Sequence, residues 1–136
     1  MPTVTKSAMW CLQQMTLEVE NTLRHSDVFC RYRGEEFSIV APQTAAEAAL
    51  LLANRIRESV AVAPLEPIRR PVTISLGMAS LTPTLIDPQE LVSAADAALY
   101  TAKAERRNHA CLFHPSVPDG ARRLNDADRR TSIRFH

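Results

Sequence analysis

Apolar and polar residues alternate along the chain with two different periods, and each period predicts one kind of secondary structure. Between residues 6 and 25 the apolar positions recur at three- and four-residue steps, which predicts an amphipathic helix. These positions are Met9, Leu12, Met15, Val19 and Leu23. Two short runs follow, at 27–32 and 36–42, whose β-branched and aromatic residues predict strands. The tight turn at Arg33-Gly34 predicts that these two strands form a hairpin.

The second half of the chain continues with helices and strands in alternation. An alanine- and leucine-rich run with Thr44 as its expected N-cap predicts a helix that extends to about Val60. The remaining expected elements are, in order, a strand at about 71–80, a helix that begins at about Pro88 with Asp87 as its N-cap, and a strand at 109–113.

The order of these elements decides the class of fold. A helix, a hairpin, a helix, a strand, a helix and a strand form one α+β domain over residues 1–114, with helices packed on an antiparallel or mixed sheet. The 136 residues, of which 46% are hydrophobic, agree with a single core. Beyond Pro115 the chain becomes polar, so we expect residues 115–136 to be a disordered tail.

Charge and cysteine content narrow the class of partners and the compartment. The formal net charge is +1, which gives no reason to expect nucleic acid or an anionic membrane as a partner. No apolar stretch approaches the length of a membrane span, and the N-terminus shows no signal-peptide pattern. The cysteines stand far apart in apolar surroundings, which favours buried free thiols in a reducing compartment and therefore a cytoplasmic protein.

The turn of the predicted hairpin carries the first candidate chemistry. The stretch RYRGEEF, residues 31–37, places Glu35 and Glu36 side by side after Gly34. Two neighbouring carboxylates repel each other less when a divalent cation lies near them, and hard oxygen ligands favour Mg²⁺. A glycine lets the backbone approach a bulky ligand. The turn alone also fits a simpler interpretation, in which its charges keep the sheet edge soluble, because charged hairpin tips are common.

Three stretches that occur in the order RYRGEEF, PVTISLGMAS and AADAALYTAKAERRN resemble the GGDEF family, the diguanylate cyclases. The resemblance runs from about Leu12 to about Phe113. It implies a ferredoxin-like or nucleotidyl-cyclase-like fold and an enzyme that condenses two GTP into cyclic di-GMP with release of pyrophosphate. It also implies Mg²⁺ or Mn²⁺ as cofactor and a homodimer in which each domain holds one GTP.

By this resemblance the hairpin turn holds the catalytic residues. Glu36 looks like a metal ligand, and Glu35 looks like the residue beside the ribose 3′-hydroxyl, either as a metal ligand or as a helper in its deprotonation. Gly34 matches the glycine that lets the backbone approach the nucleotide. Lys103 and Arg107 match the basic pair that holds the triphosphate, and their i, i+4 spacing predicts one face at the end of a helix. Without the resemblance, these two residues are better explained as solvated charges that favour the helix dipole.

A second site follows from the same resemblance. Arg24 and Asp27 have the Arg-x-x-Asp spacing of the family's inhibitory product site, and Arg55 matches a further arginine of that site. An arginine fork can grip guanine edges or phosphate, and an aspartate can accept hydrogen bonds from guanine nitrogens. The alternative is a surface ion pair at the end of a helix, which contributes little to stability.

The chain also departs from the family pattern. The family's first strand, which carries another metal-binding aspartate, is missing, so the resemblance is to a partial domain. Arg33 replaces the first glycine of the signature, and if this position required positive φ the arginine would cost about 1 kcal/mol or more. Met9 falls where the family has an aspartate that reads guanine, and Arg106 replaces a glycine at a helix end.

Two functions follow as alternatives. The first is a diguanylate cyclase domain of impaired activity. The second is a degenerate domain that acts as a cyclic di-GMP receptor or as a dimerisation module, neither of which requires a metal ion.

Overall fold

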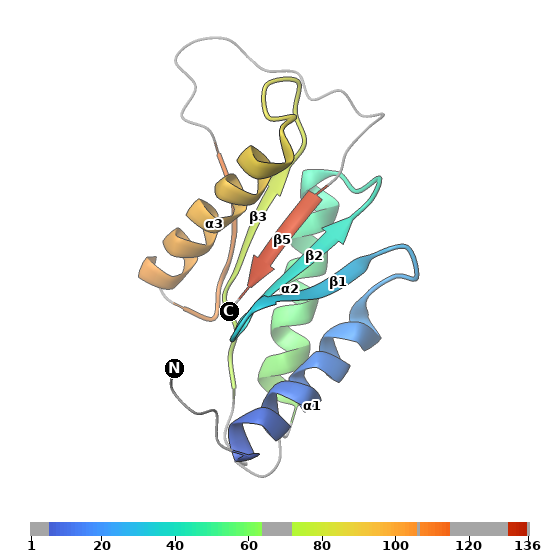
Figure 1. Ribbon diagram of the computed structural model, residues 1–136, viewed down its shortest axis with the longest axis vertical. Helices are drawn as coiled ribbons and strands as arrows, with labels where there is room; N and C mark the ends of the chain where they lie inside the picture. Colours follow the sequence, from blue (N-terminus) through green and yellow to red (C-terminus); the bar gives the residue numbers. More distant parts are fainter. Residues whose placement is uncertain (1–5, 64–71, 106, 115–130, 136) are drawn as a thin grey trace.

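The computed structural model describes residues 6–63, 72–105, 107–114 and 131–135. These residues form one sheet with helices packed on both of its faces (Figure 1). The elements are, in chain order, α1 (Lys6–Thr22), β1 (Val28–Arg33), β2 (Glu36–Ala41), α2 (Ala46–Val62), β3 (Leu76–Ser80), α3 (Pro88–Glu105), β4 (Ala110–Leu112) and β5 (Thr131–Phe135). The elements expected up to residue 114 are therefore present, with shifted ends. Helix α1 ends at Thr22 instead of residue 25, and β3 begins at Leu76 instead of residue 71.

The sheet has five strands in the order β1-β2-β5-β3-β4. The first two strands form an antiparallel hairpin, and β5 is antiparallel to both of its neighbours. Strands β3 and β4 are parallel to each other. The sheet is therefore mixed, which confirms the α+β class expected from the hairpin and the helices around it.

The central strand β5 comes from the part of the chain that was expected to be a disordered tail. The expected disorder of 115–136 is wrong for 131–135, whereas 115–130 and 136 lie outside the described residues. The pairing is regular on both sides, since Ile133 pairs with Ile39 of β2 and with Met78 of β3. The sequence Thr-Ser-Ile-Arg-Phe alternates β-branched or aromatic residues with polar ones, which is a strand pattern. The polar composition of the longer segment concealed this short stretch.

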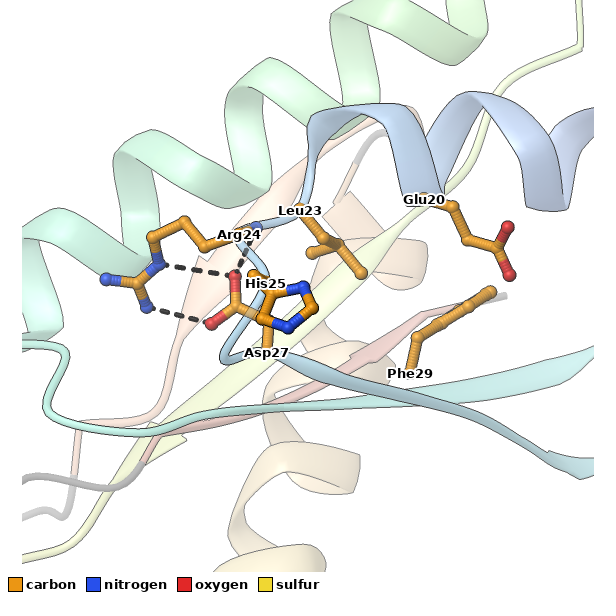
Figure 2. A pocket seen from close by; sticks show the side chains of 6 residues that line it. All are labelled: Glu20, Leu23, Arg24, His25, Asp27 and Phe29. Carbon is orange, nitrogen blue, oxygen red and sulfur yellow. Dashed lines mark hydrogen bonds and ion pairs between the residues drawn. The ribbon is translucent and has the colours of Figure 1, made fainter.

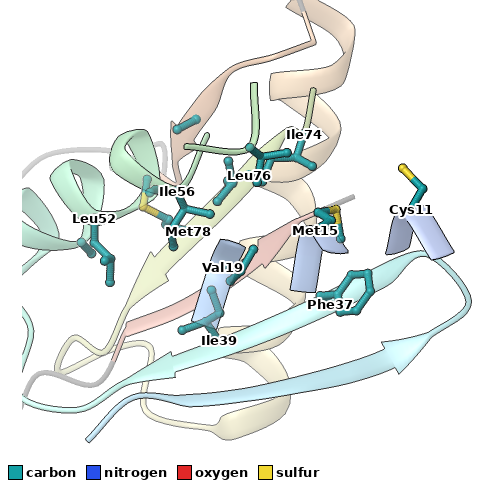
Figure 3. Close-up of a cluster of buried hydrophobic side chains, with 14 residues drawn as sticks. Cys11, Met15, Val19, Phe37, Ile39, Leu52, Ile56, Ile74, Leu76 and Met78 are labelled. Atoms are coloured by element: carbon teal, nitrogen blue, oxygen red, sulfur yellow. The ribbon is translucent and has the colours of Figure 1, made fainter. Parts of the chain in front are cut away.

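Two clusters of buried apolar side chains lie on the two faces of the sheet. The larger cluster lies between the sheet and the helices α1 and α2 (Figure 3). Its fully buried members include Val19, Ile39, Ile56, Val60, Leu76 and Met78. The smaller cluster lies under α3 and contains Ala79, Leu91, Ala94 and Ala95. Side chains alternate along β3, so Leu76 and Met78 enter the larger cluster, whereas Gly77 and Ala79 face α3.

Helix α3 can lie directly on β3 because residue 77 is a glycine. A Cβ atom on Gly77 would lie 2.2 Å from the backbone nitrogen of Leu99 and 2.3 Å from the carbonyl oxygen of Ala95. No side chain fits in that space, so the helix and the strand approach each other at backbone distance. This contact fixes α3 and its C-terminal end relative to the sheet.

The starts of α2 and α3 test the expected caps. Pro88 is the first residue of α3, and the Asp87 carboxylate accepts a hydrogen bond from the Gln89 backbone N–H at 2.7 Å, as expected for a cap. The cap expected at Thr44 is wrong. Ala45 holds the N-cap position of α2 without a side-chain cap, and the Thr44 hydroxyl donates to the carbonyl oxygen of Pro42 at 2.9 Å. Among the described helices, none has the length and hydropathy that a membrane crossing requires.

Candidate functional site

The signature turn joins β1 to β2, and a glycine in the left-handed region closes it. Gly34 has φ +48°, and a Cβ atom on it would meet nothing within 4 Å, so within the chain the glycine is required by the backbone conformation and not by a close packing contact. The Arg31 Nε donates to the Gly34 carbonyl oxygen at 2.7 Å. The register shifts between Arg31 and Arg33, which is a bulge one step before the turn.

Arg33 replaces the first glycine of the signature, but it does not adopt the positive φ that would strain an arginine backbone. Within the described ranges, the non-glycine residues with positive φ are Gln43, Arg107 and Asn108. Arg33 belongs to β1 and pairs with Glu36 across the turn. The turn therefore needs one glycine, at position 34, and tolerates arginine before it. The replacement at Arg106 lies outside the described residues.

The two carboxylates of the turn differ in exposure. Glu35 is exposed, Glu36 is half-buried, and Phe37 is buried in the core. The Phe37 ring stacks on that of Phe29 with ring centroids 5.6 Å apart and planes 17° from parallel. The stack fixes the base of the hairpin in the core, so the carboxylates are presented at the rim from a rigid support.

A hollow of about 320 Å³ lies between α1 and the base of the hairpin. Met9, Leu12 and Gln13 line it from α1, and Phe29 and Arg31 line it from β1. The other lining residues are Thr16, Glu20, Cys30 and Phe37, so the walls are partly apolar and also carry an amide, a hydroxyl, a thiol, a carboxylate and a guanidinium.

Lys103 and Arg107, the basic residues expected to hold a triphosphate, do not lie on one helix. Lys103 is half-buried in the last turn of α3, but the helix ends at Glu105, so Arg107 lies beyond it. The single helical face predicted from the i, i+4 spacing of Lys103 and Arg107 is therefore wrong. Arg107 has φ +51°, and its backbone N–H donates to the carbonyl oxygen of Ala102 at 3.1 Å, which closes the end of the helix. Its side chain is exposed.

Arg24 and Asp27 are brought together after the end of α1 (Figure 2). The Asp27 carboxylate accepts from the Arg24 backbone N–H and from its Nη2, both at 2.9 Å. Arg24 also donates to the Thr44 hydroxyl. The pair lines a hollow of about 560 Å³ with His25 and Phe29.

Arg55 is not part of that hollow. It is exposed on α2 and lines a separate hollow of about 460 Å³, together with Asn21 and Thr22 of α1. The structure therefore joins two of the three residues expected for the product site and places the third on the neighbouring helix.

Two functional candidates were missed by the sequence analysis. Glu20 and Phe29 each line both the hollow beside the turn and the hollow beside Asp27, so the two hollows share walls along the seam of α1 and β1. For Phe29 the sequence did contain a signal. Phe29 is two residues after Asp27, and side chains two apart in an extended chain point to the same side. Helical spacing gives no such signal for Glu20, because nothing in the sequence distinguishes it from the other polar residues of α1.

A metal ion would have limited protein ligation here. In the part of the chain that the structure describes, no three His, Cys, Asp or Glu side chains gather at one point. Glu35 and Glu36 are nevertheless hard oxygen donors of the kind that Mg²⁺ prefers, and Mg²⁺ is often held by one or two carboxylates together with substrate phosphates and water. The donor set of the turn fits that mode of binding.

Comparison with known proteins identifies the family. The sequence model described as "Diguanylate cyclase, GGDEF domain" matches residues 8–109. Diguanylate cyclase A of Treponema denticola is 34% identical over 109 residues, which are 79% of this chain and 29% of that protein. The response regulator PleD of Caulobacter vibrioides is 37% identical over 101 residues, which are 71% of this chain and 22% of that protein. The chain thus spans less than a third of the length of these relatives.

Solved structures give the same result. The active GGEEF domain of a diguanylate cyclase from Vibrio cholerae superposes with a TM-score of 0.77 at 28% identity, covering 82% of this chain and 72% of that one. The GGDEF domain of DgcB from Caulobacter crescentus in complex with cyclic di-GMP gives 0.71 at 25% identity, covering 76% and 63%. The α+β fold expected from the resemblance is confirmed. The chain belongs to the GGDEF family of diguanylate cyclase domains.

Proposed function

We propose that this domain binds GTP in the hollow beside the signature turn and takes part in the condensation of two GTP to cyclic di-GMP. One observation carries the proposal: Glu35 and Glu36 follow Gly34 at the turn of a hairpin whose base, the stacked Phe29 and Phe37, lines a hollow of about 320 Å³. Acidic residues beside a nucleotide pocket are the arrangement that phosphoryl transfer requires, because positioning and charge neutralisation supply most of the catalysis.

The chain's own residues have separate roles in this proposal. The base of GTP lies on the apolar walls of the hollow, where the Gln13 amide offers both a donor and an acceptor. The polyphosphate is held by the positive charges of Lys103 and Arg107. Glu35 and Glu36 would hold Mg²⁺ or Mn²⁺, which when bound neutralises phosphate charge.

The reaction needs two nucleotides that face each other, so we propose that two copies of the domain form the active homodimer. The 3′-hydroxyl of each GTP attacks the α-phosphorus of the other, the new phosphodiester bond forms, and pyrophosphate leaves. Glu35 lies at the exposed rim of the turn, where it can accept the hydroxyl proton. With two carboxylates as the ligands at the turn, we expect turnover to be impaired.

The test is incubation of the purified chain with labelled GTP and Mg²⁺, with products separated by chromatography. Glu36→Gln keeps the size of the side chain and removes its charge. Glu47→Gln on α2 makes the same change at another exposed carboxylate. Cyclic di-GMP formed by the wild type and by Glu47→Gln but not by Glu36→Gln is the expected result. No product from the wild type at high protein concentration would overturn the cyclase proposal for this chain.

A second candidate function is the binding of cyclic di-GMP at Arg24, whose exposed guanidinium is oriented by the enclosed Asp27 carboxylate. The observation that favours it is the hollow of about 560 Å³ lined by this pair and by the Phe29 ring. A planar base can stack on an aromatic face while the guanidinium binds phosphate. The related DgcB domain was solved in complex with cyclic di-GMP. This function requires no metal ion and remains open if the cyclase activity is lost.

Calorimetric titration with cyclic di-GMP separates this candidate from the first. Arg24→Ala is expected to weaken binding by about tenfold or more, because a charge-assisted bond to phosphate is lost. Arg24→Lys keeps the positive charge but loses the forked donors of the guanidinium, so its affinity for cyclic di-GMP should lie between those of the wild type and Arg24→Ala. If Arg55→Ala also weakens binding, the ligand extends to the second hollow between α1 and α2. Equal affinity of the wild type and Arg24→Ala would contradict the assignment.

A further inference from the structure

Two consecutive residues that follow α3 adopt a backbone conformation that is unfavourable for L-amino acids. Arg107 has φ +51° and Asn108 has φ +45°. Asparagine tolerates the left-handed region better than most residues, but arginine does not. Such conformations persist where the surrounding structure holds them, and they concentrate at functional sites. The question is what holds this one, since Arg107 is the residue proposed to bind polyphosphate.

A side chain from another helix contacts this turn. Arg57 of α2 donates from Nη1 to the Oδ1 of Asn108 at 3.2 Å, across 51 positions of sequence. The backbone on either side is also fixed: the Arg107 N–H bonds to the Ala102 carbonyl oxygen at 3.1 Å, and the His109 carbonyl oxygen accepts from the Leu76 N–H at 2.9 Å. These two backbone bonds fix the ends of the turn, and Arg57 holds its middle.

The Arg57 guanidinium is itself oriented from its own helix. Its Nε donates to the Asn54 Oδ1 at 3.2 Å, and its Nη2 lies 3.5 Å from the Glu58 carboxylate. The side chain is only 21% exposed. A guanidinium held at three of its nitrogens has little freedom, so it transmits the position of α2 to Asn108.

We propose that Arg57 is a positioning residue of the nucleotide site. By holding Asn108 in the left-handed region, it sets the direction in which the neighbouring Arg107 side chain leaves the backbone, and so places that guanidinium for the polyphosphate. The inference rests on the proposed binding of GTP. Arg57 makes no contact with the nucleotide in this account and acts only through the turn.

The alternative is that the contact between Arg57 and Asn108 merely stabilises the connection between α3 and β4. The two accounts differ in what a loss of Arg57 does to ligands with and without phosphate. A positioning role weakens GTP binding and leaves guanosine binding unchanged. A purely structural role affects both ligands alike or neither.

The experiment measures the affinity of the full chain for GTP with Mg²⁺ and for guanosine, by calorimetry. Arg107→Ala is expected to weaken GTP binding by about tenfold or more. Arg57→Ala is expected to weaken it by about threefold to tenfold in the wild type, and to have no effect once Arg107 is alanine, because the two changes remove one contact. Lys6→Ala, at an exposed site on α1, controls for the loss of one positive charge.

Two further variants keep the test sharp if Arg57→Ala does not fold. Arg57→Lys keeps the positive charge and a single donor nitrogen, and it should retain part of the affinity for GTP. Asn108→Gly accepts the left-handed conformation without the tether. It should bind GTP more weakly than the wild type because the turn is no longer fixed, and it should be insensitive to Arg57→Lys.

The outcomes separate the two levels of the proposal. If Arg107→Ala leaves GTP affinity unchanged, or the wild type does not bind GTP, the proposed nucleotide site is overturned and this inference falls with it. If Arg107→Ala weakens GTP binding but the Arg57 variants do not, the positioning role alone is overturned. The positioning role is also overturned if loss of Arg57 weakens guanosine and GTP binding equally. It is overturned as well if the losses of GTP affinity from Arg57→Ala and Arg107→Ala are fully additive in the double variant.

Discussion

The Asp27 carboxylate is completely enclosed, although the Arg24 side chain that covers it is 50% exposed. Asp27 accepts the backbone N–H of Arg24 as well as its guanidinium, both at 2.9 Å. The pair therefore closes the turn that leads from α1 into β1. A contact proposed to bind a ligand also has a structural role, and the two roles are separable by mutation.

Asp27→Ala is expected to lower the free energy of unfolding by about 1–3 kcal/mol, because both the Arg24 N–H and its guanidinium lose their acceptor. Asp27→Asn should cost less, since its amide oxygen still accepts that bond. Chemical denaturation of both variants beside the wild type measures the difference. Equal stability of Asp27→Ala and the wild type would show that the turn does not depend on this carboxylate.

The same substitution at two glycines is expected to have different costs for different reasons. Gly77→Ala should destabilise by about 3 kcal/mol or more, because the new Cβ would lie 2.2 Å from the Leu99 backbone nitrogen and would push α3 off β3. Gly34→Ala should cost about 1 kcal/mol, since it meets no atom within 4 Å but must keep φ +48°. Thermal or chemical unfolding tests both, and the reverse order would contradict the packing of α3 described here.

Strand β5 is expected to be essential for a cooperative fold. Removing residues 131–136 leaves β2 and β3 each with an unpaired edge at the centre of the sheet. We expect a loss of the sharp thermal transition and a tendency to aggregate. Ile133→Pro should act similarly, because proline cannot donate within a strand that is paired on both sides. Removal of residue 136 alone is the control, and a truncated chain as stable as the full one would refute the role of β5.

The three cysteines should react with iodoacetamide at different rates. The expected burial of the thiols is wrong for Cys30, which is exposed on β1 and should therefore be modified first. Burial raises the pKa of Cys11, and burial together with the charge of Glu105 raises the pKa of Cys111, so less thiolate is present at these two at neutral pH. Glu105→Gln removes the negative charge and should lower the pKa of Cys111. Mass spectrometry over time checks this, and an unchanged rate at Cys111 would contradict the influence of Glu105.

Local patterns were enough to predict most of the fold. The apolar spacing located α1, the turn residues located the hairpin, and Asp87-Pro88 located the start of α3. These features depend on contacts within a few residues, which sequence patterns record directly. The family resemblance was confirmed because separate motifs agreed in their order along the chain.

The remaining features depend on contacts between distant segments. Strand β5 was missed because a five-residue pattern inside a polar segment gives little signal until β2 and β3 are seen to flank it. The shared helical face of Lys103 and Arg107 was predicted from spacing, but the helix ends at Glu105. The contact of Arg57 with Asn108 has no local signal at all, because it joins α2 to a turn after α3.

The place of β5 in the sheet also sets an order of folding. It is the last described element in the chain, yet it lies between strands that form from much earlier segments. The β1–β2 hairpin and the β3-α3-β4 unit can form from nearby residues, whereas the pairing of Ile133 with Ile39 must wait for the much later residues 131–135. During synthesis the two halves would therefore remain with open strand edges until residues 131–135 leave the ribosome. Completion of the sheet is then a late and slow event, and the chain is most exposed to aggregation just before it.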